Sequence, residues 1–475
     1  MVKLFNLLKG VKCRVLGSLL VDIGGLYHND KDVKENGLFF CLNGLKNNGI
    51  KFVNSAINNG AVAIVSECEI KGLLGVTQIL VKNARKAMSL IAKNFYGNPS
   101  KELKLIGVTG TNGKTSTTHM INDMLKQLGY TSAIIGTNGV IYNGKVLNTN
   151  MTTPDPIELQ KIFRLLVNAG VKYVCMEVSA HSIYLDKIEG LKFELVIFSN
   201  LTEDHLDYFK TMDNYFDAKR KLFSKKYAKT ALVNIDDEYG EKMVDCINMP
   251  VKTYSIYSES NYKASGLCFE NFKQTFEFCG QRLESQFLGE FNVYNLLSAI
   301  ACLDILNMSL MDIQKTILNI KMIPGRFNQI VINKKLFIID YAHTPDGLLN
   351  VLLLSKKIAK SNKLICVFGC GGDRETQKRS KMGEISTKIA DFTIITSDNP
   401  RFEDKLKIIN DVESGVANRD YKVVIDRKDA IKYSDKISNV GDVVLIAGKG
   451  CEDYIDEMGV KIKYSDYEEV EKLRK

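Results

Sequence analysis

A glycine-rich segment followed by a lysine and hydroxyl side chains gives the chain its clearest chemical signature. Residues 105–118 read LIGVTGTNGKTSTT, so an apolar run leads into glycines and then into Lys114 and Thr115. Glycines let backbone N–H groups converge on phosphate oxygens, while the lysine adds a positive charge and the threonine hydroxyl can bind Mg²⁺. The segment predicts a nucleotide-binding loop made of Gly110, Thr111, Asn112, Gly113, Lys114, Thr115 and Ser116.

The elements around this loop are the ones that phosphate binding requires. An apolar strand precedes it, and residues 120–128 carry apolar side chains at helical spacing before Gly129. Such a helix directs the positive end of its dipole at a bound phosphate. From Gly107 to Gly113 there is one residue more than GxxxxGK[ST] allows, so the pattern is matched only from Gly110 onward. A glycine turn beside a lysine would not account for this order of elements.

Length and composition indicate a globular protein of several domains. The chain has 475 residues, of which 45% are hydrophobic and 25% charged, and this length predicts about three domains. No apolar run approaches the ~18 residues that a membrane span needs, and basic residues interrupt the apolar N-terminus. Eleven cysteines lack CxxC spacing, which favours reduced thiols over disulfides or a zinc site. We expect a cytoplasmic monomer without membrane insertion.

The charge of the chain does not point to nucleic acid. The formal net charge of +9 is modest for 475 residues. The densest basic stretch, residues 220–229, lacks the interleaved aromatic side chains of a groove for single strands. We interpret this stretch as a solvated helix face and expect no nucleic-acid partner.

The order of apolar runs predicts an α/β fold with three domains. Between residues 103 and 237, runs that are apolar throughout repeatedly end in polar clusters, as strands buried on both faces of a mostly parallel sheet do. This predicts a central, doubly wound domain around the nucleotide-binding loop. A similar pattern resumes near Asn328 and predicts a C-terminal, Rossmann-like α/β domain. Residues 1–100 mix short strands with a helix near 84–96 and predict a small N-terminal α/β domain.

Two of the polar clusters carry groups that bind metals. Glu177 ends one predicted strand, and Asn200, Asp204 and His205 follow the next. Mg²⁺ on a triphosphate takes hard oxygen ligands and keeps several waters. Alone, either cluster would more often be a satisfied polar cap, but ligands sit beyond the carboxyl ends of such strands, where the predicted loop also lies.

The variant loop TGTNGKTS resembles that of the Mur ligases and of their folylpolyglutamate synthetase relatives, which join a carboxylate to an amine with ATP. MTTPDP at 151–156, FGCGGDR at 368–374, SDNPR at 397–401 and AGKG at 447–450 extend the resemblance over nearly the whole chain. They are similar to the branch that adds the third residue of the peptidoglycan stem peptide. The resemblance implies a UDP-sugar-binding domain at 1–100, an ATP-binding domain at 101–327 and an amino-acid-binding domain at 328–475.

The resemblance also implies the catalytic and nucleotide-binding residues. Lys114, Glu177, His205 and Lys219 would be catalytic, with Thr115, Glu177, His205 and a carbamylated Lys219 holding Mg²⁺. A carbamate formed with CO₂ turns the lysine cation into a carboxylate-like anion. By spacing alone, Lys219 would be a surface lysine of a helix. Asn292, Asn295, Arg326, Asp340 and His343 would meet ATP, the last two from the segment DYAHTP at 340–345.

The substrates implied are UDP-N-acetylmuramoyl-L-alanyl-D-glutamate and meso-diaminopimelate, joined through an acyl phosphate. Arg401 can clamp the distal carboxylate of diaminopimelate, whereas it would repel the bare ammonium of lysine. Asp398 and Asn399 can accept from the distal ammonium. The implied substrate-binding residues are Asp30, Thr152, Thr153, Ser179, Lys187, Arg374, Asp398, Asn399, Pro400, Arg401, Gly448 and Glu452. The chain departs from the family pattern at Asn29-Asp30-Lys31, Ala180, Leu185, Lys187 and Cys451.

Other functions remain as alternatives. The same ligation could use L-lysine, and a folylpolyglutamate synthetase would share the loop and the metal ligands but is not expected to carry the N-terminal domain or SDNPR. A P-loop ATPase that binds nucleic acid would need a basic aromatic groove, which the sequence lacks. A non-catalytic amino-acid sensor would require loss of Lys114 or Glu177, and both are present.

Overall fold

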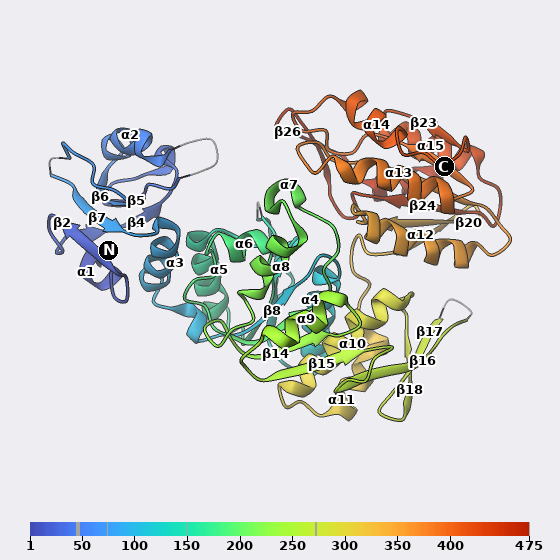
Figure 1. Ribbon diagram of the computed structural model, residues 1–475, viewed down its shortest axis with the longest axis horizontal. Coiled ribbons are helices and arrows are strands. Elements are labelled where there is room, and N and C mark those ends of the chain that lie inside the picture. Colours follow the sequence, from blue (N-terminus) through green and yellow to red (C-terminus); the bar gives the residue numbers. More distant parts are fainter. Residues whose placement is uncertain (44–47, 74, 150, 271–272, 475) are drawn as a thin grey trace.

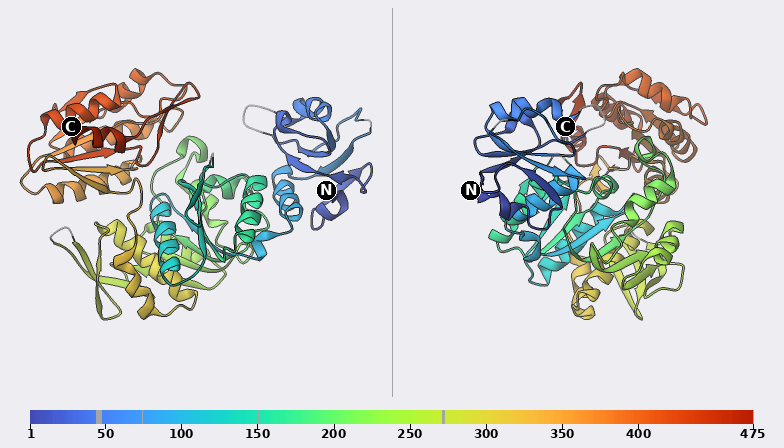
Figure 2. Two further views of the ribbon diagram at one scale, coloured as in Figure 1. Left: turned by 180° about the vertical axis from the view of Figure 1, so that it is seen from behind. Right: turned by 60° about the vertical axis from the view of Figure 1, so that its left-hand side comes forward.

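Three separate sheets, each flanked by helices, organise the chain (Figure 1). The computed structural model describes residues 1–43, 48–73, 75–149, 151–270 and 273–474. The blue N-terminal part and the orange and red C-terminal part lie on different sides of the central part, and Figure 2 shows the same separation from behind. The predicted fold class of three α/β domains is confirmed.

The N-terminal part contains a five-stranded sheet in the order β2-β7-β6-β5-β4, parallel except at β2. Its helix α3 begins where the Asn83 side chain accepts from the Lys86 N–H, and α3 packs against α5 of the central part. The elements of the N-terminal part are β1 Val2–Lys3, α1 Leu4–Leu7, β2 Cys13–Leu16, β3 Asp22–Ile23, β4 Gly25–Tyr27, β5 Gly37–Phe40, α2 Val53–Asn58, β6 Ala61–Ser66, β7 Thr77–Val81 and α3 Ala84–Phe95, whereas α5 of the central part spans Pro156–Asn168.

The central sheet has eleven strands in the order β11-β10-β9-β12-β8-β13-β14-β15-β16-β17-β18. Strands β9 to β16 along this order are parallel, and antiparallel strands extend the sheet at both ends. The strands are β8 Lys104–Thr109, β9 Ser132–Gly136, β10 Gly139–Tyr142, β11 Lys145–Leu147, β12 Tyr173–Glu177, β13 Phe193–Phe198, β14 Ala228–Asn234, β15 Val251–Ser255, β16 Tyr262–Glu270, β17 Lys273–Phe278 and β18 Gln281–Ser285.

Both faces of the central sheet are buried, as the apolar runs predicted. In β8, Leu105 belongs to the core on one face, whereas Ile106 and Val108 belong to the core on the other. The covering helices, besides α5, are α4 Lys114–Gln127, α6 Ala180–Tyr184, α7 Leu206–Phe209, α8 Met212–Arg220, α9 Glu238–Cys246, α10 Glu290–Ile305 and α11 Leu310–Thr316. The prediction that residues 220–229 form a solvated helix face is wrong, because α8 ends at Arg220 and β14 begins at Ala228.

The C-terminal sheet has the order β19-β20-β24-β21-β22-β23, and only β19 is antiparallel to its neighbour. Its elements are β19 Asn328–Ile332, β20 Lys335–Asp340, α12 Pro345–Ala359, β21 Leu364–Phe368, α13 Gln377–Ile389, β22 Phe392–Ile395, α14 Lys405–Glu413, β23 Tyr421–Val423, α15 Arg427–Ile437, β24 Val443–Ala447, β25 Tyr454–Glu457, β26 Val460–Lys463 and α16 Asp466–Glu471. No helix within the described ranges is long and apolar enough to cross a membrane.

Candidate active site between the central and C-terminal domains

A cavity of about 370 Å³ lies between the central and C-terminal sheets and is lined by residues of both. All seven residues of the predicted nucleotide-binding loop line it, as do Glu177, His205 and Lys219. The other predicted residues that line it are Thr152, Ser179, Asn292, Asn295, Arg326, Asp340, His343, Arg374, Asp398, Asn399, Arg401, Gly448 and Glu452. The structure therefore gathers most of the predicted site residues in one place.

The nucleotide-binding loop connects β8 to α4 and leaves no room for side chains at its glycines. A Cβ atom on Gly110 would lie 1.9 Å from the Ser199 Oγ, and one on Gly113 would lie 2.5 Å from the Asn295 Oδ1. Lys114 is the first residue of α4, and its ammonium donates to the carbonyls of Gly110 at 2.9 Å and Thr111 at 2.8 Å. Burial lowers the pKa of Lys114, and Glu177 and Asp204 act in the opposite direction.

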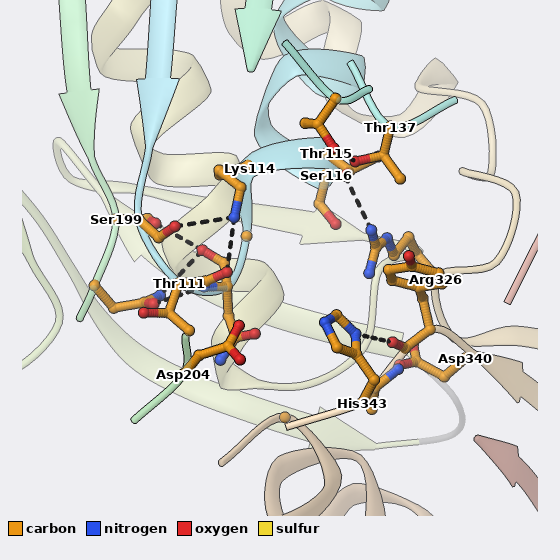
Figure 3. Close-up of a pocket in the computed structure, with 18 of the residues that line it drawn as sticks. Thr111, Lys114, Thr115, Ser116, Thr137, Ser199, Asp204, Arg326, Asp340 and His343 are labelled. Atoms are coloured by element: carbon orange, nitrogen blue, oxygen red, sulfur yellow. Dashed lines mark hydrogen bonds between the residues drawn. The ribbon is translucent and has the colours of Figure 1, made fainter. Parts of the chain in front are cut away.

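Glu177 ends β12 with its carboxylate beside the start of α4. Its Oε1 accepts from the Thr115 hydroxyl at 3.0 Å and from the Thr137 N–H at 2.9 Å. A Cβ on Gly136 would lie 2.2 Å from this oxygen, so a glycine is required there. Figure 3 shows Thr115 and Thr137 next to each other, with Arg326 across from them.

His205 lies at the start of α7 with a left-handed backbone, and its neighbour Asp204 is buried. The His205 Nε2 is 3.4 Å from one Asp204 oxygen, and the Lys378 Nζ of α13 is 3.5 Å from the other. Burial raises the pKa of Asp204, but Lys378 and His205 outweigh this effect and hold it below its ordinary value. Asp204 is thus an ionised group that links the two domains.

Lys219 is buried, contrary to the expectation from its spacing alone. Its side chain, on α8, is 1% exposed and donates from Nζ to the Gly110 carbonyl at 2.8 Å. The ammonium also lies 4.6 Å from the centre of the Tyr215 ring. Burial and the charge of Lys114 lower the pKa of Lys219 well below its ordinary value, which favours an unprotonated amine.

The other predicted nucleotide contacts come from α10 and from the segments around β20. Arg326 donates to the Thr115 hydroxyl at 2.9 Å across the cavity, and Figure 3 shows it on the same side as Asp340 and His343. Asp340 accepts from the N–H groups of Phe327 and Ala342 at 2.8 and 2.7 Å. These hydrogen bonds fix the backbone where the chain passes between the central and C-terminal sheets. Asn292 and Asn295 are hydrogen-bonded to each other on α10.

The C-terminal end of the cavity is formed by loops that follow β21, β22 and β24. Arg401 donates to the Gly372 carbonyl at 2.6 Å and has a left-handed backbone with φ 51°. Asn399 donates to Glu452 at 2.8 Å, and its oxygen already accepts from Lys449 and from the Asp456 N–H. The predicted role of Asn399 as an acceptor for substrate stays a prediction.

Four predicted substrate residues do not line the cavity. Asp30 belongs to the N-terminal part and accepts from the Ser55 hydroxyl at 2.6 Å. Lys187 forms an ion pair with Asp155 at 2.8 Å, and the Thr153 hydroxyl donates to the Glu177 carbonyl at 2.9 Å from behind the site. Pro400 is buried next to Arg401.

Several residues of the site were missed from the sequence. Ser199 follows β13 and supports the nucleotide-binding loop by donating to the Asn112 carbonyl at 2.6 Å, and its place after an apolar run was a usable signal. Lys378 gave no such signal, because a lysine in a helix is exposed by default. Lys449 lies in the AGKG segment, but its burial could not be predicted from that motif. Cys451, one of the departures from the family pattern, contacts Asn138 across the two domains at 3.0 Å.

Two regions of the chain match models of known protein families. The Mur ligase middle domain matches residues 108–303, and the Mur ligase glutamate ligase domain matches residues 325–450.

No ion-binding group of three or more His, Cys, Asp or Glu side chains is found in the described part of the chain. A metal there would need further ligands from substrate or water.

Individual relatives extend this similarity to almost the full length. The UDP-N-acetylmuramoyl-L-alanyl-D-glutamate–2,6-diaminopimelate ligase 1 of Clostridium acetobutylicum is 40% identical over 477 residues, covering 99% of this chain and 98% of the relative. A solved structure of a UDP-N-acetylmuramoyl-L-alanyl-D-glutamate–2,6-diaminopimelate ligase is 30% identical, with a TM-score of 0.69 and 96% of both chains covered. The folylpolyglutamate synthase of Mycobacterium tuberculosis shares the fold over 76% of this chain, at 14% identity and a TM-score of 0.64.

Proposed function

The chain belongs to the Mur ligase family, and from this premise we propose that it ligates 2,6-diaminopimelate to UDP-N-acetylmuramoyl-L-alanyl-D-glutamate in peptidoglycan precursor synthesis. It is an ATP-dependent ligase that joins a carboxylate to an amine. The observation that carries the proposal is a single cavity with the nucleotide-binding loop at one end and Asp398, Arg401 and Glu452 at the other. Phosphoryl transfer and amide formation can then follow each other without release of the activated substrate.

The geometry fits a reaction through an acyl phosphate. An amine cannot displace oxide from a carboxylate at neutral pH, so the D-glutamate carboxylate first attacks the γ-phosphate of ATP and releases ADP. The amine of the incoming amino acid then attacks the acyl carbon and expels phosphate. Lys114, which donates to the Thr111 carbonyl of the nucleotide-binding loop, and Arg326, which donates to the Thr115 hydroxyl, would offset the negative charge of the transferring phosphoryl group. Contacts between the domains would exclude water from the acyl phosphate.

Magnesium is the metal that the donor set favours. Glu177 offers a buried carboxylate 3.0 Å from the Thr115 hydroxyl, and His205 lies in the same cavity. Mg²⁺ is ordinarily held by one or two carboxylates together with substrate phosphates and waters, so these residues fit it without a larger cluster. When bound, the ion supplies charge neutralisation at the phosphates.

Carbamylation of Lys219 is the second part of the proposal. Only an unprotonated amine reacts with CO₂, and burial beside Lys114 favours that form of Lys219. A carbamate at this position would place a negative charge near the Lys114 ammonium, so the two groups would attract each other.

The experiment that tests the proposed function is release of phosphate from ATP in the presence of UDP-N-acetylmuramoyl-L-alanyl-D-glutamate and one added amino acid. We expect release and a new tripeptide product with meso-diaminopimelate, and much less of both with L-lysine. A mixture of folate and glutamate should give none. Equal use of lysine would favour the lysine-adding alternative, and turnover with folate would reject the proposal.

A further inference from the structure

Two buried cationic side chains, Lys449 and Arg427, lie next to the residues that form the amino-acid end of the cavity. Lys449 is 0% exposed, and its Nζ donates to the Asn399 Oδ1 at 2.9 Å and lies 3.2 Å from a Glu452 oxygen. It is also 3.7 Å from the Asp398 Oδ1. Lys449 therefore touches or faces each of three polar residues that line the cavity, although it does not line the cavity itself.

The second cation is Arg427, which is 1% exposed. Its guanidinium makes a bidentate pair with Asp466, with both distances 2.8 Å, and donates to the Ala447 carbonyl at 2.9 Å. Its remaining nitrogen has no hydrogen-bond partner among the described residues and points toward the Asp398 Oδ2 at 3.8 Å. Asp398 thus has a cation near each of its oxygens.

The positions of these cations bear on which charged groups the pocket can accept. Asp398 and Glu452 would attract any ammonium group, but Lys449 offsets much of that attraction from a few ångströms away. A zwitterionic amino-acid head adds no net charge and brings a carboxylate that Arg401 can pair with. A bare ammonium adds one positive charge and has no such compensation.

We propose that Lys449 is a positioning residue that sets specificity, because its buried ammonium balances Asp398 and Glu452 and so makes the pocket select an amino-acid head over a bare ammonium. The inference rests on the proposed function and deepens it. Selection by Lys449 differs from selection by Arg401, because Lys449 acts on the carboxylates of Asp398 and Glu452.

The test is Lys449→Met, assayed for ligation of meso-diaminopimelate and of L-lysine, with kcat/KM measured for each. We expect the ratio of the two values to fall about tenfold, since an uncompensated carboxylate attracts lysine at the reduced dielectric of the site. The KM for ATP should stay within about twofold. Lys335→Met is the matched control: Lys335 is an ion-paired lysine of the same domain, 2.8 Å from Asp435, that does not line the cavity. It should leave the ratio unchanged.

If Lys449→Met does not fold, Lys449→Gln takes its place, because it removes the charge while its amide can still donate to the Asn399 Oδ1. Glu452→Gln removes a negative charge and should raise the ratio, and Lys449→Met with Glu452→Gln should bring it back to within about threefold of the wild type. A ratio that does not move in the folded variants overturns the role of Lys449. Wild-type protein that fails to ligate diaminopimelate at all would instead reject the proposed function.

Discussion

The two ends of the cavity are built on different principles. The nucleotide end is a contiguous segment, residues 110–116, whose shape depends on glycines where a Cβ would collide with Ser199 or Asn295. The amino-acid end is assembled from loops after three different strands and is supported by buried charges such as Lys449 and Arg427. A phosphate is bound mainly by backbone groups, whereas an amino-acid head is recognised by side chains whose charges must balance.

The difference has a consequence for mutation. Changes at the nucleotide end should affect every substrate, because all ligation passes through the transferring phosphoryl group. Changes at the amino-acid end should alter the choice of substrate more than the rate of phosphoryl transfer.

The largest effect is expected for Lys114→Ala. Ligation should fall about a thousandfold or more, the scale of losing a charged group that stabilises the transition state. The fold should persist, because the Lys114 ammonium contacts loop carbonyls and its removal leaves no buried carboxylate unpaired. Steady-state kinetics and thermal unfolding measure the two quantities. Turnover near the wild-type value would remove the assignment of the loop.

Lys219→Ala should lower ligation nearly as much as Lys114→Ala, but its activity should respond to an added carboxylic acid. We expect a loss of about a hundredfold or more, partly restored by a short carboxylic acid in the buffer that occupies the place of the carbamate. Lys221→Ala changes an exposed lysine next to the same helix and should have no effect. A crystal structure with an unmodified amine at Lys219, solvated and away from nucleotide, would contradict the assigned role.

The contrast between the two ends of the cavity also explains which features could be predicted from the sequence. Strands such as β8 and β13 are apolar on both faces, so their position and the polar residues after them follow from local pattern. Strands β16 to β18 were not predicted, although β17 pairs with its sequence neighbours on both sides. Their residues mix buried and exposed positions and include many polar side chains, so these strands lack the continuous apolar runs that identified the others. The burial of Lys219 and Lys449 could not be derived either, since a lysine is buried only when the rest of the fold surrounds it. Lys219 was identified by resemblance alone.

Arg401→Ala should change the choice of amino acid more than the rate of activation. Hydrogen bonds to charged groups contribute about 1.5–3 kcal/mol, so use of meso-diaminopimelate should fall by roughly one to two orders of magnitude. Lysine should gain relative to diaminopimelate, because it loses a repulsive partner. The readout is kcat/KM for both amino acids, with the KM for ATP as internal control. An unchanged ratio would mean that the distal carboxylate is recognised elsewhere, with Arg374 the next candidate.

The smallest effects concern the contacts that join the two ends, where α13 offers two lysines one turn apart. Lys378 pairs with Asp204 inside the cavity, with both side chains 7% exposed, whereas Lys381 pairs with Glu203 and is 48% exposed. Lys378→Ala leaves the buried Asp204 carboxylate without its lysine partner, with only His205 beside its other oxygen, so we expect activity to fall about tenfold. Lys381→Ala should cost less than about twofold, because exposed ion pairs contribute about 0–1 kcal/mol.

Salt separates these two pairs further. Added salt screens exposed charges far more than buried ones, so the small effect of Lys381→Ala should vanish at high ionic strength while that of Lys378→Ala persists. Kinetics of both variants at low and high salt provide the measurement. If both variants lost activity equally, closure of the domains would depend on the surface charge of α13 as a whole. The buried pair would then have no special part in holding the nucleotide end against the amino-acid end.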